Sequence, residues 1–141
     1  MKIPSYEDTH EQPLTTDEQV LERVTLLVRN ALRRQLWLMF LDGDDRQLPV
    51  LMPTDVPARP RSSDASELAR FIHGVNDELG ASSIVVALER RGSDEISDDD
   101  GAWLRLVRDA AEMAELRLRG PVLVHTRGVR WVAVEDYALS D

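Results

Sequence analysis

Residues 82–120, SSIVVALERRGSDEISDDDGAWLRLVRDAAEMAELRLRG, set the architecture of the chain, because they join a buried strand to a long helix through an acidic loop. The first eight, SSIVVALE, have a β-branched centre, which is typical of a strand. After the loop, acidic residues fill the first turn of a helical stretch and arginines its last, as the helix dipole favours. We predict a strand over 82–89 and a helix over 98–120.

The amino-terminal region contains one further helical pattern. Thr15 is followed three residues later by Glu18, the spacing of a capping box. Apolar residues then recur on one face of a 3.6-residue helix. We predict a helix over 15–34, ending near Arg34. Residues 1–13 are polar and show no periodicity, so we expect a flexible tail ahead of a domain over 14–141.

A β-hairpin is predicted after this helix. The apolar run LWLMFLD, residues 36–42, is consistent with a strand buried on both faces. An acidic turn leads to RQLPVLM, residues 46–52, where Pro49 lacks a backbone donor and favours an edge strand. The proline-rich residues 53–64 then predict an extended loop.

The remaining elements complete a layered domain. Residues 65–80 have helical spacing, with Ser63 or Asp64 as the cap and Gly80 at the carboxyl end. Residues 121–126 and 129–137 predict a closing hairpin. The order α-β-β-α-β-α-β-β predicts a single three-layer α/β domain, with a five-stranded mixed sheet and flanking helices.

Composition and charge exclude several classes of function. The chain of 141 residues has no cysteine, which excludes disulfides, zinc–thiolate sites and thiol nucleophiles. No apolar run approaches the roughly 18–20 residues of a membrane span, and the amino terminus has no secretory pattern. We expect a soluble, cytoplasmic protein. A net charge of −9 makes nucleic acid and anionic membranes poor partners.

The acidic loop has two interpretations. Ser97 is a good N-cap, and Asp98, Asp99 and Asp100 then occupy a first helical turn, which favours a plain helix start. The competing interpretation is a metal site. An EF-hand is excluded, because the aspartates are contiguous rather than alternating and no bidentate glutamate stands at the twelfth position.

Other candidate side chains carry weaker signals. Neither a nucleophile elbow nor a phosphate or dinucleotide loop is present. The scattered histidines and the tryptophans are interpreted as structural, with ligand binding or stacking as the alternative. These residues are His10, His73, His125, Trp37, Trp103 and Trp131.

Four arginine pairs are spread over separate elements, and one of them lies at a favourable place for a ligand. Arg90 and Arg91 follow the carboxyl end of the strand over 82–89, where α/β folds tend to bind ligands. They could bind an anion or nucleic acid. Given the net charge, we favour solvated salt bridges to the many carboxylates for all four pairs. The others are Arg33–Arg34, Arg59–Arg61 and Arg117–Arg119.

The loop and its flanks resemble the RadC branch of the JAB/MPN metalloprotease-like domains. In that family a strand runs through the pattern H-x-H-P-S-G-x-x-x-P-S-x-x-D into a long helix. Here Ala87 and Glu89 stand at the two histidine positions. The residues that match the pattern are Gly92, Ser97 and Asp100, and those that replace its other positions are Arg90, Arg91 and Ile96.

The resemblance extends to the flanking elements and covers residues 36–134. LWLMFLDGDDRQL is similar to the family's first hairpin, and DASELARFIHGVNDELGASSIVVA to its helix-into-strand segment. AEMAELRLRGPVLVHTRGVRWVAV is similar to its closing helix and hairpin. The resemblance implies a JAB-type, cytidine deaminase-like fold.

What the family implies for chemistry is not matched by the residues. The family holds zinc with two imidazoles and an aspartate, and it uses a glutamate near the first hairpin as general acid/base. Ala87 has no ligand atom, and Glu89 with Asp100 would make at best a weak Mg²⁺ or Ca²⁺ site. QLPVLMP holds no glutamate, and Asp55 lies beyond it. We therefore expect no catalytic residue, no bound metal and no cofactor.

These observations lead to three hypotheses about function. The first is a non-catalytic JAB/RadC-like domain that acts as an interaction or scaffold module, as a homodimer or with a protein partner. The second is a divalent-metal hydrolase with a rearranged site at Glu89 and Asp100. The third is an anion- or nucleic-acid-binding domain that uses Arg90 and Arg91.

Overall fold

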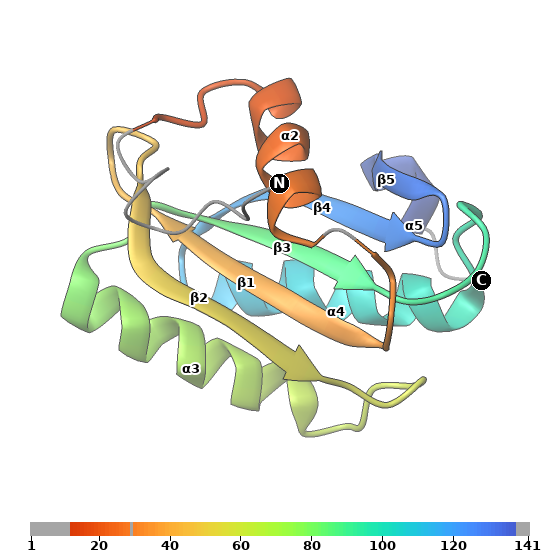
Figure 1. Cartoon of the computed structure of the whole chain (residues 1–141). Coiled ribbons are helices and arrows are strands. Elements are labelled where there is room, and N and C mark those ends of the chain that lie inside the picture. The colour runs from red at the N-terminus through yellow and green to blue at the C-terminus, as the bar shows by residue number, and fades with distance from the viewer. Residues whose placement is uncertain (1–11, 29, 138–141) are drawn as a thin grey trace.

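The computed structural model of the chain describes residues 12–28 and 30–137. They form one small α/β domain in which four helices surround a five-stranded mixed sheet (Figure 1). This confirms the predicted class. The elements are α2 (Asp17–Leu27), β1 (Gln35–Leu41), β2 (Gln47–Asp55), α3 (Asp64–Leu79), β3 (Ser83–Glu89), α4 (Asp98–Met113), β4 (Arg117–His125), β5 (Gly128–Trp131) and α5 (Val134–Tyr137).

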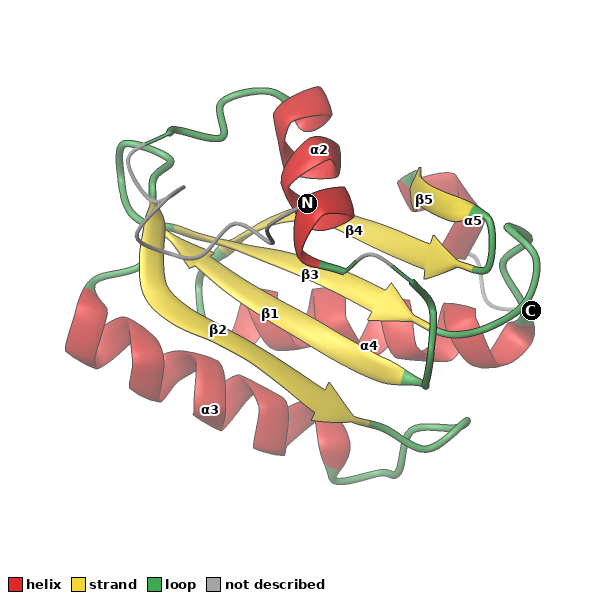
Figure 2. Ribbon diagram, viewed as in Figure 1, coloured by secondary structure: helices red, strands yellow, loops and turns green. Residues whose placement is uncertain are grey.

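The sheet is open, with the strand order β2-β1-β3-β4-β5 (Figure 2). β1 pairs antiparallel with both β2 and β3, β3 pairs parallel with β4, and β4 pairs antiparallel with β5. The parallel pair requires a crossover connection, and the helix α4 supplies it. β3 is central in the sheet and buried along its whole length, which explains why residues 84–88 are all apolar.

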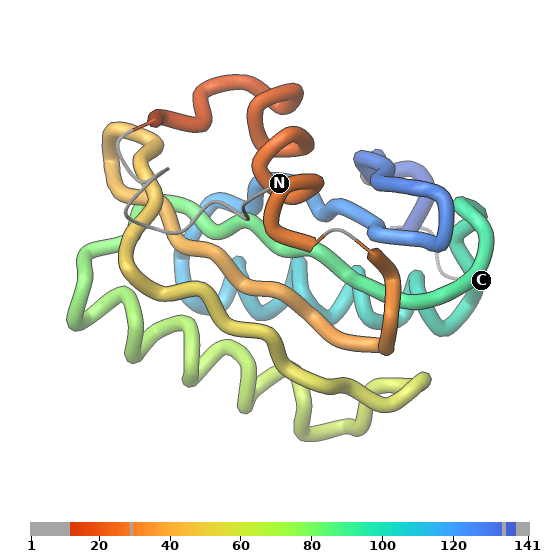
Figure 3. Tube along the Cα trace, viewed as in Figure 1, coloured from red at the N-terminus to blue at the C-terminus, as the bar shows by residue number. Residues whose placement is uncertain are grey.

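Helices cover both faces of the sheet, and the chain trace shows α2 on one side with α3 and α4 on the other (Figure 3). Side chains alternate along each strand, so neighbouring residues enter different clusters. Leu38 packs in the cluster of α3 and α4, whereas its neighbour Met39 packs in the cluster under α2. The predicted burial of this strand on both faces is confirmed.

The predicted amino-terminal helix is too long and its cap is wrong by one residue. The capping box is formed by Thr16 and Gln19, and α2 ends at Leu27 rather than near Arg34. The chain beyond the helix is drawn toward the sheet, because the backbone N–H groups of Leu32 and Arg33 donate to Glu89. These tertiary contacts override a helix-compatible sequence.

The helix α4 also ends early. It stops at Met113, because Glu115 adopts a left-handed conformation with φ of 58°, which reverses the chain. Arg117 and Arg119 therefore lie in β4, where pairing with β3 begins at Ser83, and not in the last turn of a helix as predicted.

Two further boundaries differ from the prediction. β2 continues through residues 53–55, which were expected to be loop, because these residues pair with β1. The closing strand is only four residues long, and residues 134–137 form the short helix α5 instead of continuing it. The other predictions agree: β2 is an edge strand, and Gly80 ends α3 with a left-handed φ of 70°.

The start of the domain is close to the predicted residue 14. Leu14 is buried in the cluster under α2 and its N–H donates to Asp45 O. The predicted flexible tail, residues 1–13, falls outside the described residues except for Gln12 and Pro13. None of the helices within residues 12–28 and 30–137 has the length and apolar character needed to cross a membrane.

Candidate functional site

The residues singled out by the resemblance lie where β3 ends and the loop 90–97 leads into α4. Ala87 is buried in the cluster under α2, and its methyl group offers no ligand atom. Glu89 is the last residue of β3, and Arg90 continues onto the other face of the sheet by strand alternation. Asp100 is in the first turn of α4.

Glu89 is a buried carboxylate, 2% exposed, that accepts hydrogen bonds from four neutral donors. Leu32 N and Arg33 N donate to Oε2 at 2.7 and 3.1 Å, while Gln35 Nε2 and Trp37 Nε1 donate to Oε1 at 2.8 and 2.9 Å. Burial raises the pKa of Glu89, but the four hydrogen bonds together hold it below its ordinary value. The group is an ionised anchor for the chain that enters β1.

Asp100 is fully buried and is held by arginine. Arg90 Nη2 donates to Asp100 Oδ2 at 2.7 Å, and Arg34 Nη1 lies 3.5 Å from Oδ1. The backbone N–H of Ser97 donates to Oδ2 at 3.1 Å. Burial raises the pKa of Asp100, and the hydrogen bonds from Arg90 and Ser97, with the Arg90 charge, bring it below its ordinary value.

The Ser97 and Asp100 spacing is a capping box. Ser97 Oγ accepts from Asp100 N at 3.1 Å, and the Asp100 carboxylate accepts from Ser97 N. This confirms the predicted helix start. Arg90 adds a second constraint, because it also donates to the backbone oxygens of Ser93 and Glu95 and thereby holds the acidic loop against the sheet.

Glu89 and Asp100 are each already bound by protein donors. The two carboxylates accept from separate sets of donors that share no residue. A metal ion would have to displace those donors, and Ala87 cannot add a ligand. Within residues 12–28 and 30–137, no three histidine, aspartate or glutamate side chains are grouped so that they could hold a metal ion. The donor set does not suit zinc.

Arg90 and Arg91 are also separated. The Arg90 side chain is 8% exposed and donates to internal acceptors, whereas Arg91 is exposed. The prediction of solvated salt bridges agrees with the exposed Arg59–Asp99 pair. It is wrong for Arg90 and for Arg119, which is 3% exposed and donates to Leu14 O, because both guanidinium groups bind the chain internally.

The aromatic and histidine candidates have structural contacts. Trp103 is a buried core residue whose Nε1 donates to Pro57 O at 2.9 Å, and Trp37 and Trp131 are partly buried against the α2 cluster. His73 is exposed beside Asp77, at 3.2 Å. His125 Nδ1 accepts from Arg127 N, and His10 lies outside the described residues.

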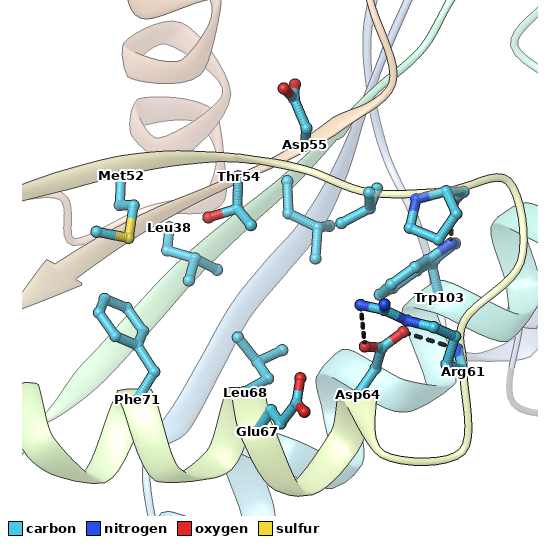
Figure 4. A pocket seen from close by; sticks show the side chains of 13 residues that line it. Leu38, Met52, Thr54, Asp55, Arg61, Asp64, Glu67, Leu68, Phe71 and Trp103 are labelled. Carbon is cyan, nitrogen blue, oxygen red and sulfur yellow. Dashed lines mark hydrogen bonds and ion pairs between the residues drawn. The ribbon is translucent and has the colours of Figure 1, made fainter.

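One feature of the described residues escaped the sequence interpretation, an apolar groove of about 290 Å³ between β2 and α3 (Figure 4). Leu38 and Met52 line it on the sheet side, Leu68 and Phe71 on the α3 side, and Trp103 at one end. Apolar residues at both positions 51 and 52 of an edge strand were the available signal, because one of two adjacent residues must face each side of the sheet.

No protein-family model matches the chain, and no curated protein is similar enough to match it.

Proposed function

We propose that this chain is a RadC-like JAB/MPN domain whose metal site has been replaced, and that it acts as a non-catalytic protein-interaction module. One observation carries the proposal. The carboxylates at the second-histidine and aspartate positions, Glu89 and Asp100, are both buried and both bound by protein donors. Protein donors therefore satisfy both of the carboxylates that stand at the family's ligand positions.

The backbone of the loop supports the family assignment. Gly92 has a φ of 124°, a conformation that L side chains rarely adopt, at the position where the family pattern has its glycine. Ser97 and Asp100 form a capping box at the S-x-x-D positions. A chain that lost its ligands would keep both features, because they serve the loop and the helix rather than the metal.

The first hairpin supplies no substitute for the missing chemistry. β2 contains no glutamate, and Asp55, at its end, is exposed and lies 3.5 Å from Arg33 Nη1. A general acid/base would need to reach a reacting group near Asp100, which Arg90 and Arg34 already occupy. The residues favour a role in binding over a role in hydrolysis.

Calorimetric titration of the purified protein with Zn²⁺, Mn²⁺ and Mg²⁺ tests the loss of the metal site. We expect no binding tighter than about millimolar, because both carboxylates would have to give up their donors first. Submillimolar binding that disappears in Asp100→Asn, and persists in the exposed loop control Asp94→Asn, would favour the hydrolase hypothesis instead. Circular dichroism of each variant verifies that it is folded.

Light scattering coupled to size-exclusion chromatography tests the interaction role. The homodimer hypothesis predicts a mass that rises toward two chains as the concentration increases. A monomer at every concentration restricts the proposal to a different protein as partner. If that monomer also selects no binding peptide in the experiment described below, the interaction role is rejected.

A further inference from the structure

We infer that the groove between β2 and α3 is a docking site for a segment of a protein partner that carries a large apolar side chain beside a lysine or arginine. The inference rests on the proposed interaction role and names the surface that performs it. It concerns residues on the sheet edge and on α3, away from the Glu89 network.

The groove lies between α3 and the carboxyl-terminal end of β2, whereas Leu48 and Val50, earlier in the same strand, pack against the core (Figure 4). Met52 pairs with Leu38 across the sheet, so both side chains face α3, and Met52 is 38% exposed. On the opposite wall, Phe71 and Leu68 are only partly buried. An apolar surface with methionine at its rim adapts readily to the side chain of a partner.

The size of the groove suits an anchoring side chain better than a cofactor. Its volume of about 290 Å³ is just below the range of roughly 300–1,000 Å³ that is typical of small-molecule sites. Interfaces between proteins concentrate their binding energy in a few large side chains seated in such hollows. One or two apolar side chains of a partner would fill the space between Met52 and Phe71.

The backbone of β2 argues against the other common way of using an edge, which is the addition of a strand. Val56 N donates to Arg34 O, so the even-numbered N–H groups at this end of β2 point toward β1. The odd-numbered groups point outward, and there Pro53 has no N–H to offer. A partner strand would lose a hydrogen bond in the middle of the edge.

The charges around the groove favour a cationic partner. The Asp64 carboxylate is already bound within the chain, since it accepts hydrogen bonds from Arg61 N at 2.7 Å and from Arg61 Nη2 at 3.1 Å. Asp55 pairs with Arg33, and its carboxylate points away from the groove (Figure 4). Glu67 is exposed on the α3 wall, and its carboxylate forms no hydrogen bond or salt bridge with another described residue, although its charge helps to raise the pKa of nearby Arg61. With a net charge of −9, the protein attracts a basic segment to this carboxylate.

Selection of a random 12-residue peptide library displayed on phage, with the whole chain as bait, tests the inference. We expect enriched peptides in which a large apolar residue lies next to lysine or arginine. Synthetic copies are then measured by fluorescence anisotropy at low and high salt. Affinity should fall with salt, and replacing the basic residue by glutamate should abolish binding.

Two matched pairs of variants locate the site. Met52→Ser should weaken peptide binding by about tenfold, whereas Leu51→Ser, equally exposed on the other face of the same strand, should leave it unchanged. Glu67→Lys should weaken it by about two- to fivefold, and Glu78→Lys, an exposed position on the same helix outside the groove, should have no such effect.

The inference is overturned by any of three results: no enrichment, enrichment of acidic peptides, or equal losses in Met52→Ser and Leu51→Ser. These failures are distinct from failure of the proposed function. Metal binding through Asp100 would contradict the non-catalytic role but would not bear on peptide binding in the groove. If the protein is a dimer that binds no metal and the library yields no binding peptide, only the docking inference is rejected.

Discussion

Glu89 and Asp100 show two ways in which the fold accommodates a buried carboxylate. Asp100 is neutralised by a guanidinium group, with Arg90 Nη2 at 2.7 Å. Among the described residues, the donors to the Glu89 oxygens are neutral N–H groups, which belong to Leu32, Arg33, Gln35 and Trp37. A buried charge is tolerated only when such donors satisfy it. Glu89 therefore ties residues 32–37 to the end of β3.

The first prediction is that Glu89→Gln destabilises the protein by about 1–3 kcal/mol, because an amide NH₂ would face N–H donors that lose their acceptor. Urea denaturation measures the free energy of unfolding. The control Glu95→Gln, whose side chain is exposed in the acidic loop, should change it by less than about 0.5 kcal/mol. Equal effects of the two substitutions would show that Glu89 is not the anchor described above.

The second prediction concerns the dependence of stability on pH. The ordinary pKa values of Glu89 and Asp100 are 4.5 and 3.8, and both are lowered in the folded protein. A carboxyl whose pKa is lowered by folding stabilises the protein above its unfolded pKa, and that stability is lost as the pH falls through the folded pKa. Stability should therefore decrease as the pH falls below about 5.

Urea denaturation at several pH values between 7 and 3 measures this decrease, and Glu89→Gln is its internal control. The difference in stability between the wild type and Glu89→Gln should shrink as the pH falls, because protonation removes the charge that the substitution removes. A difference that stays constant down to pH 3 would contradict the pKa direction assigned to Glu89.

The helix α4 is the element that the acidic loop serves. Its start is specified twice, by the capping box of Ser97 with Asp100 and by the three aspartates of its first turn. α3 begins differently. Ser63 is at its N-cap position, but the Ser63 side chain makes no capping hydrogen bond. The two helices of the same layer therefore depend on their cap residues to different degrees.

The third prediction follows from this contrast. Ser97→Ala should cost about 1 kcal/mol of stability, because the N–H of Asp100 loses its acceptor. Ser63→Ala removes no hydrogen bond from a side chain to the helix and should change stability by only a few tenths of a kcal/mol. Thermal or urea denaturation of both variants makes the comparison. A larger loss in Ser63→Ala than in Ser97→Ala would contradict it.

At the scale of the whole molecule, the sheet is the shared wall of two hydrophobic clusters. The larger cluster lies toward α3 and α4, and the smaller one lies under α2. β3 is paired on both edges and is buried along its whole length. α2, by contrast, is 11 residues long, and among the described residues it is the one helix that packs on its face of the sheet. The two regions should differ in local stability.

The fourth prediction is that backbone amides of β3 exchange with solvent only through global unfolding, whereas those of α2 exchange through local opening at least about 1–2 kcal/mol lower in free energy. Hydrogen exchange followed by nuclear magnetic resonance measures both. If α2 were protected as strongly as β3, the domain would open as a single unit and the amino-terminal layer would not be a separate one.

Local patterns were sufficient for most elements of this fold. The β-branched run of β3, the apolar run of β1, the glycine after α3 and the Ser97 N-cap of α4 are short-range signals. They located these two strands, the end of α3 and the start of α4 to within about a residue. The single α/β domain and its five-stranded mixed sheet followed from their order. The interpretation of the acidic loop as a helix start rested on the same short-range physics.

Long-range contacts controlled the rest, and no local pattern contains them. α2 ends at Leu27 because Glu89, some sixty residues later, binds the backbone of residues 32–33. Residues 117–119 belong to β4 because they pair with residues 83–85 of β3. Arg90 was expected to be solvated, but its guanidinium group binds Asp100. That contact forms only because the loop 90–97 returns the chain to the end of β3. The β2–α3 groove arises only when two elements pack side by side and leave space between them.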